Sequence, residues 1–219
     1  GKVFKKEGEK ITEGLHLAAV SFGNVLGKQW GLDPKKVDFF DIKADMISVL
    51  GTICNLKLDF IKEETLGLHP GQSAVIYSGD TEIGIIGAIH PELLNRMAIS
   101  GKVLFFEVNI DLLSPDGAKE YSPISRFPTV TRDISVVVDK SISAKLCLSA
   151  VEKLDLPNLK DLQLFDLYTG QGIDSEKKSF SISLIFQSSS STLTDVEVDN
   201  DMKRILKNLE EEVGAVLRD

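Results

Sequence analysis

The chain has 219 residues, of which 42% are hydrophobic and 26% are charged, and its formal net charge is −8. This mixture is typical of globular domains and excludes a disordered, collagen-like or coiled-coil protein. No stretch approaches the roughly 20 unbroken apolar residues that a membrane helix needs. The charged start of the chain, residues 1–7, lacks the apolar region of a signal peptide. The sequence therefore predicts a globular protein without a membrane partner.

The charge balance also bears on nucleic acids. The net charge of −8 is divided evenly, with −4 before and −4 after the end of Ala118. A protein that binds nucleic acid non-specifically usually carries an excess of basic residues. We therefore expect no DNA partner, and we expect any RNA binding to be local or shared with a basic partner.

The two cysteines, Cys54 and Cys147, lie far apart in apolar surroundings and show no C-x-x-C spacing. This usage indicates small core residues of a reduced, cytoplasmic protein. A segment rich in Pro, Ser and Gly, residues 113–123, separates two apolar regions. We therefore predict two domains, residues 1–118 and 119–219.

The first domain is predicted to mix strands with one helix. Asp41 is the expected N-cap of that helix, because apolar residues recur behind it at helical spacing. Its expected buried stripe consists of Ile42, Met46, Val49, Leu50 and Ile53. Strands are expected at residues 15–22, 73–77, 83–89 and 103–110, with a hairpin turn at 78–80.

The second domain is predicted to run strand, helix, strand, strand, helix, strand. Strands are expected at residues 134–138, 159–168, 179–186 and 215–217. Leu146, Leu148, Val151 and Leu154 mark the first helix, and a Thr194–Glu197 capping box starts the second, which Gly214 ends. This order is the ferredoxin-like split βαβ arrangement, with a four-stranded antiparallel sheet and two helices on one face. The fold class is α+β.

No local motif predicts catalysis. The three histidines, His16, His69 and His90, lack the spacing of a zinc site, and we expect them to bond to the backbone at strand ends. No G-x-S-x-G, P-loop or dinucleotide fingerprint occurs. We therefore expect no catalytic residue, no metal ligand and no cofactor in this chain.

The free sheet face of the second domain is more informative. If Phe165 and Leu167 face the helices, Asp166 and Tyr168 lie on the opposite face. Ser179, Ser181 and Ser183 share that face, because they alternate with apolar residues of the next strand. A ring, a carboxylate and several hydroxyls on a flat sheet suit single-stranded RNA, which is bound by stacking and by hydrogen bonds to base edges. The alternative is an ordinary sheet face that meets solvent.

Ordered motifs connect the chain to a known family. The second domain carries RFP at 126–128, RDI at 132–134, LFDLYTG at 164–170, KS at 178–179 and TLTD at 192–195. This set resembles the ferredoxin-fold anticodon-binding domain that ends the β subunit of bacterial phenylalanyl-tRNA synthetase. The first domain carries DFFDIK at 38–43, HPGQSA at 69–74, IGIIGAIHP at 83–91 and FEV at 106–108. It resembles part of the catalytic-like class II synthetase module of the same subunit, a mixed α/β module.

The resemblance implies a C-terminal part of that β subunit in an α2β2 phenylalanine–tRNA ligase. The α subunit of such an enzyme holds the ATP and phenylalanine site, so ATP and Mg²⁺ are implied only for the full enzyme. The family reads a guanine at the first anticodon position of tRNA(Phe), and by motif position its contacts fall on Asp166, Tyr168 and Ser179. Ser181 lies on the same predicted face. Arg132 and Lys178 are candidates for contacts to the RNA backbone.

Two further hypotheses remain beside anticodon binding. In one, the chain is purely a scaffold whose first domain packs on the α subunit and whose second domain reads no anticodon. In the other, the chain is an independent enzyme, which would need activity by this chain alone.

Overall fold

The computed structural model describes residues 1–52, 58–113 and 123–218. It divides the chain into two compact units, Gly1–Glu120 and Tyr121–Asp219. The domain boundary predicted between residues 118 and 119 lies outside the described residues, as do Cys54 and Ile53.

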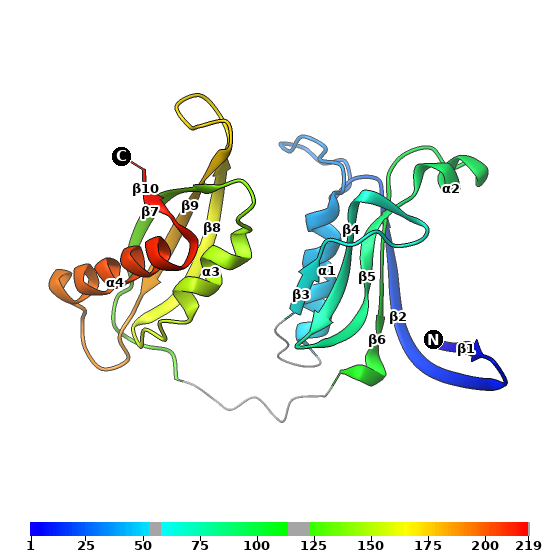
Figure 1. Ribbon diagram of the computed structural model, residues 1–219, viewed down its shortest axis with the longest axis horizontal. Helices are drawn as coiled ribbons and strands as arrows, with labels where there is room; N and C mark the ends of the chain where they lie inside the picture. Colours follow the sequence, from blue (N-terminus) through cyan, green and yellow to red (C-terminus); the bar gives the residue numbers. More distant parts are fainter. Residues whose placement is uncertain (53–57, 114–122, 219) are drawn as a thin grey trace. The chain divides into compact units, whose positions relative to one another are not determined.

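The first unit is built on a six-stranded antiparallel sheet with the order β1-β2-β6-β5-β4-β3 (Figure 1). Its strands are β1 (Lys2–Glu7), β2 (Lys10–Phe22), β3 (Leu58–Ile61), β4 (Leu68–Ser78), β5 (Thr81–Ile89) and β6 (Val103–Asn109). Its helices are α1 (Phe39–Gly51), the short α2 (Pro91–Arg96) and the 3-10 turn η1 (Ile110–Leu112). The four predicted strands and the predicted hairpin are confirmed. β1 and β3 escaped prediction because they lie at the sheet edges and bury no complete apolar face.

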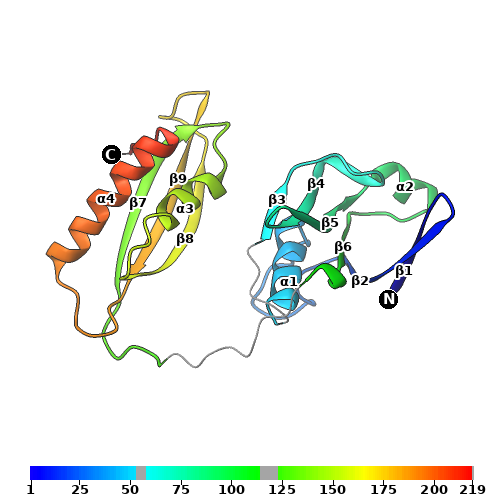
Figure 2. The ribbon, with the colours of Figure 1, turned by 60° about the horizontal axis from the view of Figure 1, so that its bottom comes forward.

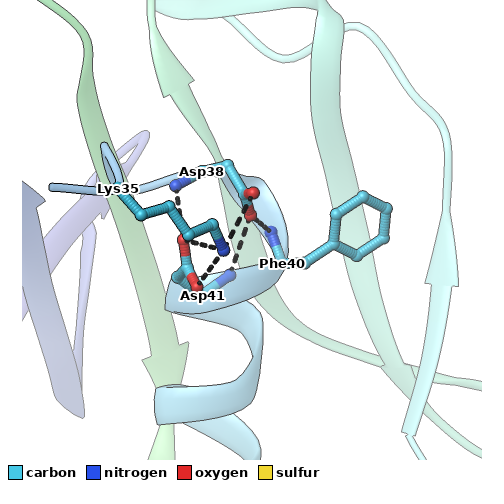
Figure 3. A network of polar contacts seen from close by, with 4 residues as sticks. All are labelled: Lys35, Asp38, Phe40 and Asp41. Atoms are coloured by element: carbon cyan, nitrogen blue, oxygen red, sulfur yellow. Dashed lines mark hydrogen bonds and ion pairs between the residues drawn. The ribbon is translucent and has the colours of Figure 1, made fainter. Parts of the chain in front are cut away.

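The start of α1 differs from the prediction by three residues. The N-cap is Asp38, whose carboxylate accepts hydrogen bonds from the amides of Phe40 and Asp41. Asp41 is the N3 residue of this capping box, and its carboxylate accepts from the Asp38 amide at 2.8 Å (Figure 3). The prediction of Asp41 as N-cap was wrong because the sequence offers two acids at capping-box spacing. Lys35 bonds the carboxylates of both acids.

The buried face of α1 packs on the sheet of the first unit. Ile42, Met46 and Leu50 are almost fully buried against β4, β5 and β6. Val49, which the sequence analysis placed in this stripe, is exposed. A narrower stripe is sufficient because the helix covers the sheet with one side only.

The second unit is a four-stranded antiparallel sheet with the order β10-β7-β9-β8. Its elements are β7 (Val130–Asp139), α3 (Ala144–Glu152), β8 (Leu159–Tyr168), β9 (Lys177–Phe186), α4 (Asp195–Val213) and β10 (Val216–Leu217). Both helices cover the same face of the sheet (Figure 2). The predicted ferredoxin-like arrangement is therefore confirmed. We call the opposite face of this sheet the outer face.

The core of the second unit lies between this sheet and its helices. β9 contributes Phe180, Ile182, Leu184 and Phe186, all buried as predicted. α3 contributes Cys147, Ala150 and Val151, whereas Leu146 is exposed, so the predicted face of this helix was wrong at that position. The Ser143 cap starts the helix one turn before Cys147. Cys147, Ala150 and Val151 then follow one another at helical spacing on the buried side, and Leu146 lies beside this stripe. Burial raises the pKa of the Cys147 thiol, as expected for an inert core cysteine.

α4 is framed by the two signals seen in the sequence. The Thr194 hydroxyl accepts from the Glu197 amide, and the Glu197 carboxylate accepts from the Thr194 amide, which confirms the capping box. Gly214 ends the helix with a φ of 63°, the left-handed conformation that glycine adopts readily. The chain then returns to the sheet as β10.

Candidate nucleic-acid interface

Strand register places four of the six predicted site residues on the outer face. On β8, Asp166 lies opposite Ser181 and Tyr168 lies opposite Ser179. β9 continues these rows to β7, where Ser181 lies opposite Ser135 and Ser179 opposite Val137. Since cross-strand partners share a face, the ring, the carboxylate and both hydroxyls are on one surface, as the sequence analysis expected.

A β-bulge in β8 produces this arrangement. The register shifts between Leu164, which lies opposite Ile182 of the core, and Asp166 on the outer face. Phe165 is the extra residue of the bulge and is 59% exposed, so the expectation that it packs under the helices is wrong. Leu167 lies in the row of buried Phe180 but is itself exposed. The bulge thus shifts the alternation of side chains at the end of β8, so that Asp166 and Tyr168 point to the outer face.

The two central serines of the outer face differ in their bonding. The hydroxyls of Ser181 and Ser135 lie 2.9 Å apart, within hydrogen-bond distance. Ser179 is only 1% exposed, and its hydroxyl has no hydrogen-bond partner among the described residues. The expectation of an open hydrogen-bonding hydroxyl at Ser179 is therefore not met in this conformation, because neighbouring side chains cover it.

Tyr168 carries the exposed ring of this face. Its hydroxyl donates to the carbonyl of Gln171 at 3.1 Å, and its side is packed against Gly170. The guanidinium carbon of Arg218 lies 4.9 Å from the centroid of the ring. Arg218 was not predicted as a site residue from the sequence. The alternation of side chains along β10 could have identified it. Leu217 lies opposite the buried Val136, so the next residue points to the outer face.

The two predicted cations lie in other rows. Arg132 is opposite buried Leu184, and its guanidinium donates to the carboxylate of Asp195 at 3.0 Å. Lys178 is opposite buried Val138, and its ammonium donates to the carbonyl of Lys140 at 2.8 Å. The structure therefore does not bring Arg132 and Lys178 together with the four outer-face residues.

The histidines of the first unit are bonded within the fold. His69 and His90 accept hydrogen bonds from the amides of Gly71 and Glu92, which confirms the structural interpretation of both. His16 differs, because its partner is the carboxylate of Glu107 at 2.7 Å and not the backbone. Within the described ranges, no group of three or more His, Cys, Asp or Glu side chains could hold a metal ion. No helix among those residues is long and apolar enough to cross a membrane.

Comparison with known proteins matches one family model to each unit. The family model described as "Phenylalanyl tRNA synthetase beta chain CLM domain" matches residues 1–110. The model described as "Ferredoxin-fold anticodon binding domain" matches residues 125–218.

Whole-sequence relatives agree with the two family models. The chain is 35% identical over 219 residues to the phenylalanine–tRNA ligase beta subunit of Methylococcus capsulatus, covering 100% of the chain and 28% of that protein. It is 36% identical over 204 residues to the beta subunit of Colwellia psychrerythraea, covering 93% of the chain and 25% of the relative. The beta subunit of Carboxydothermus hydrogenoformans is 35% identical over 222 residues, covering 100% of the chain and 28% of the relative. The chain thus spans about a quarter of the length of these relatives.

Proposed function

Because the chain belongs to the phenylalanyl-tRNA synthetase β-chain family, we propose that its second unit binds the anticodon of tRNA(Phe). The observation that carries this proposal is the outer face of the β10-β7-β9-β8 sheet. It joins one aromatic ring, one exposed carboxylate and two hydroxyls in adjacent rows. A flat sheet with these groups can stack one base and bond its edge.

Each outer-face residue has a chemical role in this proposal. Tyr168 stacks on the first anticodon base. Asp166 accepts hydrogen bonds from N1–H and N2–H of a guanine, because a carboxylate has only acceptors to offer. Ser179 and Ser181 supply hydroxyls in the rows beside them. The combination favours guanine, since cytosine cannot present two adjacent donors to the carboxylate.

Arg132 and Lys178 stay in the proposal as candidates for phosphate contacts, although the strand register places both in rows of buried core residues. Phosphate contacts orient an RNA without reading its bases. Both cations already have partners within the second unit. RNA must therefore compete for them with an exposed carboxylate in one case and a carbonyl in the other.

The activity of the full enzyme is also a proposal here, since the chain spans about a quarter of its relatives. We propose that it acts within an ATP-dependent phenylalanine–tRNA ligase of the cytoplasm and is itself catalytically silent. The described residues contain no cluster of metal-ligating side chains. We propose that ATP and Mg²⁺ bind in another part of the α2β2 assembly, as the family resemblance implies.

A titration with anticodon stem-loops tests RNA reading. The chain is titrated with a tRNA(Phe) stem-loop and with a second stem-loop whose first anticodon guanine is replaced by cytosine. We expect the guanine form to bind more tightly, and Tyr168→Ala to weaken it by about 1–3 kcal/mol, the size of a lost base stack. Phe165→Ala is the matched control, because Phe165 is an exposed aromatic residue of the same strand outside the outer-face rows. Equal binding of both stem-loops, unaffected by Tyr168→Ala, would refute anticodon reading.

A scaffold role is the second candidate, and one surface favours it. The hairpin of β1 and β2 exposes large apolar side chains, including Phe4 at 64% and Ile11 at 65%. Exposed apolar patches of this kind mark protein contacts. We propose that this hairpin meets the α subunit. Phe4→Ser with Ile11→Ser is expected to reduce co-purification of the α subunit while leaving stem-loop binding intact, and unchanged co-purification would exclude the hairpin as that contact.

A further inference from the structure

Arg218 and Tyr168 come from opposite edges of the sheet in the second unit. β8 and β10 are its two edge strands, with β9 and β7 between them. Neighbouring strands are about 4.8 Å apart, so three spacings separate the two backbones by roughly 14 Å. The Arg218 amide donates to the carbonyl of Ser135, which anchors it beside β7. A contact of 4.9 Å between the guanidinium carbon and the ring centroid therefore has to cross the outer face.

The contact crosses the face diagonally, because the Arg218 backbone lies beside Ser135 in the row of Ser181. Ser179 lies in the neighbouring row, which is that of Tyr168. It is opposite Tyr168 on one side and Val137 on the other. Its hydroxyl is fully buried and unpartnered within the part of the chain that the structure describes. Buried hydroxyls are nearly always hydrogen-bonded, and one that is not calls for an explanation. The pair of Tyr168 and Arg218 explains the burial, but it gives the hydroxyl no partner.

The ring of Tyr168 has close neighbours at Gly170 and at Arg218. A Cβ at Gly170 would lie 2.4 Å from the ring carbon Cζ, so the ring already rests on the backbone of that turn. The guanidinium of Arg218 occupies a position over the ring. Planar guanidinium groups stack on aromatic faces as bases do. A base that stacks on the side of Tyr168 that Arg218 covers has to take this position.

We propose that Arg218 is a further residue of the RNA-binding face and acts as a displaceable cover. In the free protein it stacks on Tyr168, and together they close over Ser179. An incoming purine base replaces the guanidinium on the ring, and the opened face exposes the Ser179 hydroxyl to the edge of that base. Cation–π contacts at exposed sites are weak, whereas a stacked base contributes more, so the exchange favours RNA. This inference rests on the proposed function and adds the conformational step that precedes base recognition.

Tyrosine NMR on the full chain tests the cover directly. The sequence has three tyrosines, so ring-labelled tyrosine gives few signals, and Tyr168→Phe assigns the relevant one. Arg218→Gln removes the cation and keeps the backbone bond to Ser135. Arg204→Gln is the matched control, because this arginine lies on α4 and pairs with Asp201. In the absence of RNA, we expect Arg218→Gln to shift the Tyr168 signal and Arg204→Gln to leave it unchanged.

Binding of the tRNA(Phe) anticodon stem-loop completes the test. The comparison is made at about 0.5 M salt, where exposed charges are screened and the loss of one cation costs little. Removing the cover should then tighten binding by about two- to fivefold, the strength of an exposed cation–π contact. Weaker binding by Arg218→Gln at this salt concentration, or an unmoved Tyr168 signal in the free protein, would overturn the cover while leaving anticodon binding in place. Failure of the wild-type chain to prefer guanine would overturn the proposed function and the cover together.

Discussion

Gly170 and Tyr168 are packed so closely that no side chain fits between them. A Cβ added at Gly170 would lie 2.4 Å from both Cζ and the hydroxyl oxygen of Tyr168. Real Cβ atoms do not approach other heavy atoms so closely, and thus the ring would have to move. The φ angle of Gly170 is not in the left-handed region. The glycine is therefore required by the position of the ring and not by the backbone.

Gly170→Ala should displace the Tyr168 ring without unfolding the second unit. The clash involves the far end of an exposed side chain, so we expect the free energy of unfolding to change by less than about 0.5 kcal/mol. RNA affinity should fall by up to about 1–3 kcal/mol, the range for a lost base stack. Stem-loop titration and urea unfolding measure the two effects. Gln171→Ala is the control. The Tyr168 hydroxyl donates to the backbone carbonyl of Gln171, which this substitution keeps. Full RNA affinity in Gly170→Ala would mean that the ring position is not needed.

Ser179→Ala separates the stability of the fold from its proposed function. Removing a buried hydroxyl without a partner should leave the stability unchanged or raise it, since no hydrogen bond is lost. RNA affinity should fall by about 1 kcal/mol if the exposed hydroxyl bonds a base edge. Ser183→Ala, two outer-face rows further along the same strand, should change neither quantity by as much. A clear loss of stability in Ser179→Ala would show that the hydroxyl has a structural bond after all.

The sequence was most informative where apolar and polar residues alternate without interruption through a whole strand. β9 alternates without interruption, so its four core residues and its outward serines follow directly from parity. The alternation along β8 is interrupted by the bulge. Leu162 and Leu164 lie on the helix-covered face before it, and Leu167, three residues after Leu164, lies on the same face. Local parity around Asp166 and Tyr168 gave the right face for both. It could not identify Phe165 as the extra residue, because a bulge depends on the pairing partner.

Contacts between distant segments account for the rest of the site. Arg218 follows a two-residue strand, and only the order of the sheet brings it to Tyr168. Arg132 and Lys178 were selected for their charge, but the register puts both in rows of buried residues. The burial of Ser179 was equally hidden, because strand alternation assigns a residue to a face without showing how far other residues cover it. The alternation of side chains along a strand predicts the face on which a residue lies. Which other side chains cover that residue depends on tertiary contacts.

The α1 cap should contribute measurably to the first unit. Asp38 bonds two amides of the first turn and pairs with Lys35, and the ring of Phe40 points away from this network (Figure 3). Asp38→Ala removes the cap and should lower the free energy of unfolding by about 1 kcal/mol. Asp38→Asn keeps an N-cap acceptor and loses only an exposed ion pair, so its effect should be within a few tenths of a kcal/mol. Hydrogen exchange of the α1 amides measures both changes. Equal losses in the two variants would assign the stability to the ion pair.

Glu197 should make the stability of the second unit depend on pH. Hydrogen bonds from the amide and then the hydroxyl of Thr194 lower the pKa of the Glu197 carboxyl below its usual value. A carboxyl with a lowered pKa in the folded state stabilises the fold above its unfolded pKa of about 4.3, and this contribution is lost as the pH falls below that value. Glu197→Gln can still complete a capping box but does not titrate. The stability advantage of the wild type over Glu197→Gln should therefore shrink between about pH 6 and pH 3.

Urea unfolding at a series of pH values measures this difference. The Tyr168 ring signal reports on the second unit alone, so unfolding of the first unit does not interfere. Other carboxylates titrate in the same range, and the comparison between variants cancels their contribution. Glu210→Gln, on the same helix but outside the capping box, is the control for the loss of one carboxylate. A wild-type curve that runs parallel to that of Glu197→Gln down to the lowest pH would show that the Thr194–Glu197 bonds do not distinguish the folded from the unfolded state.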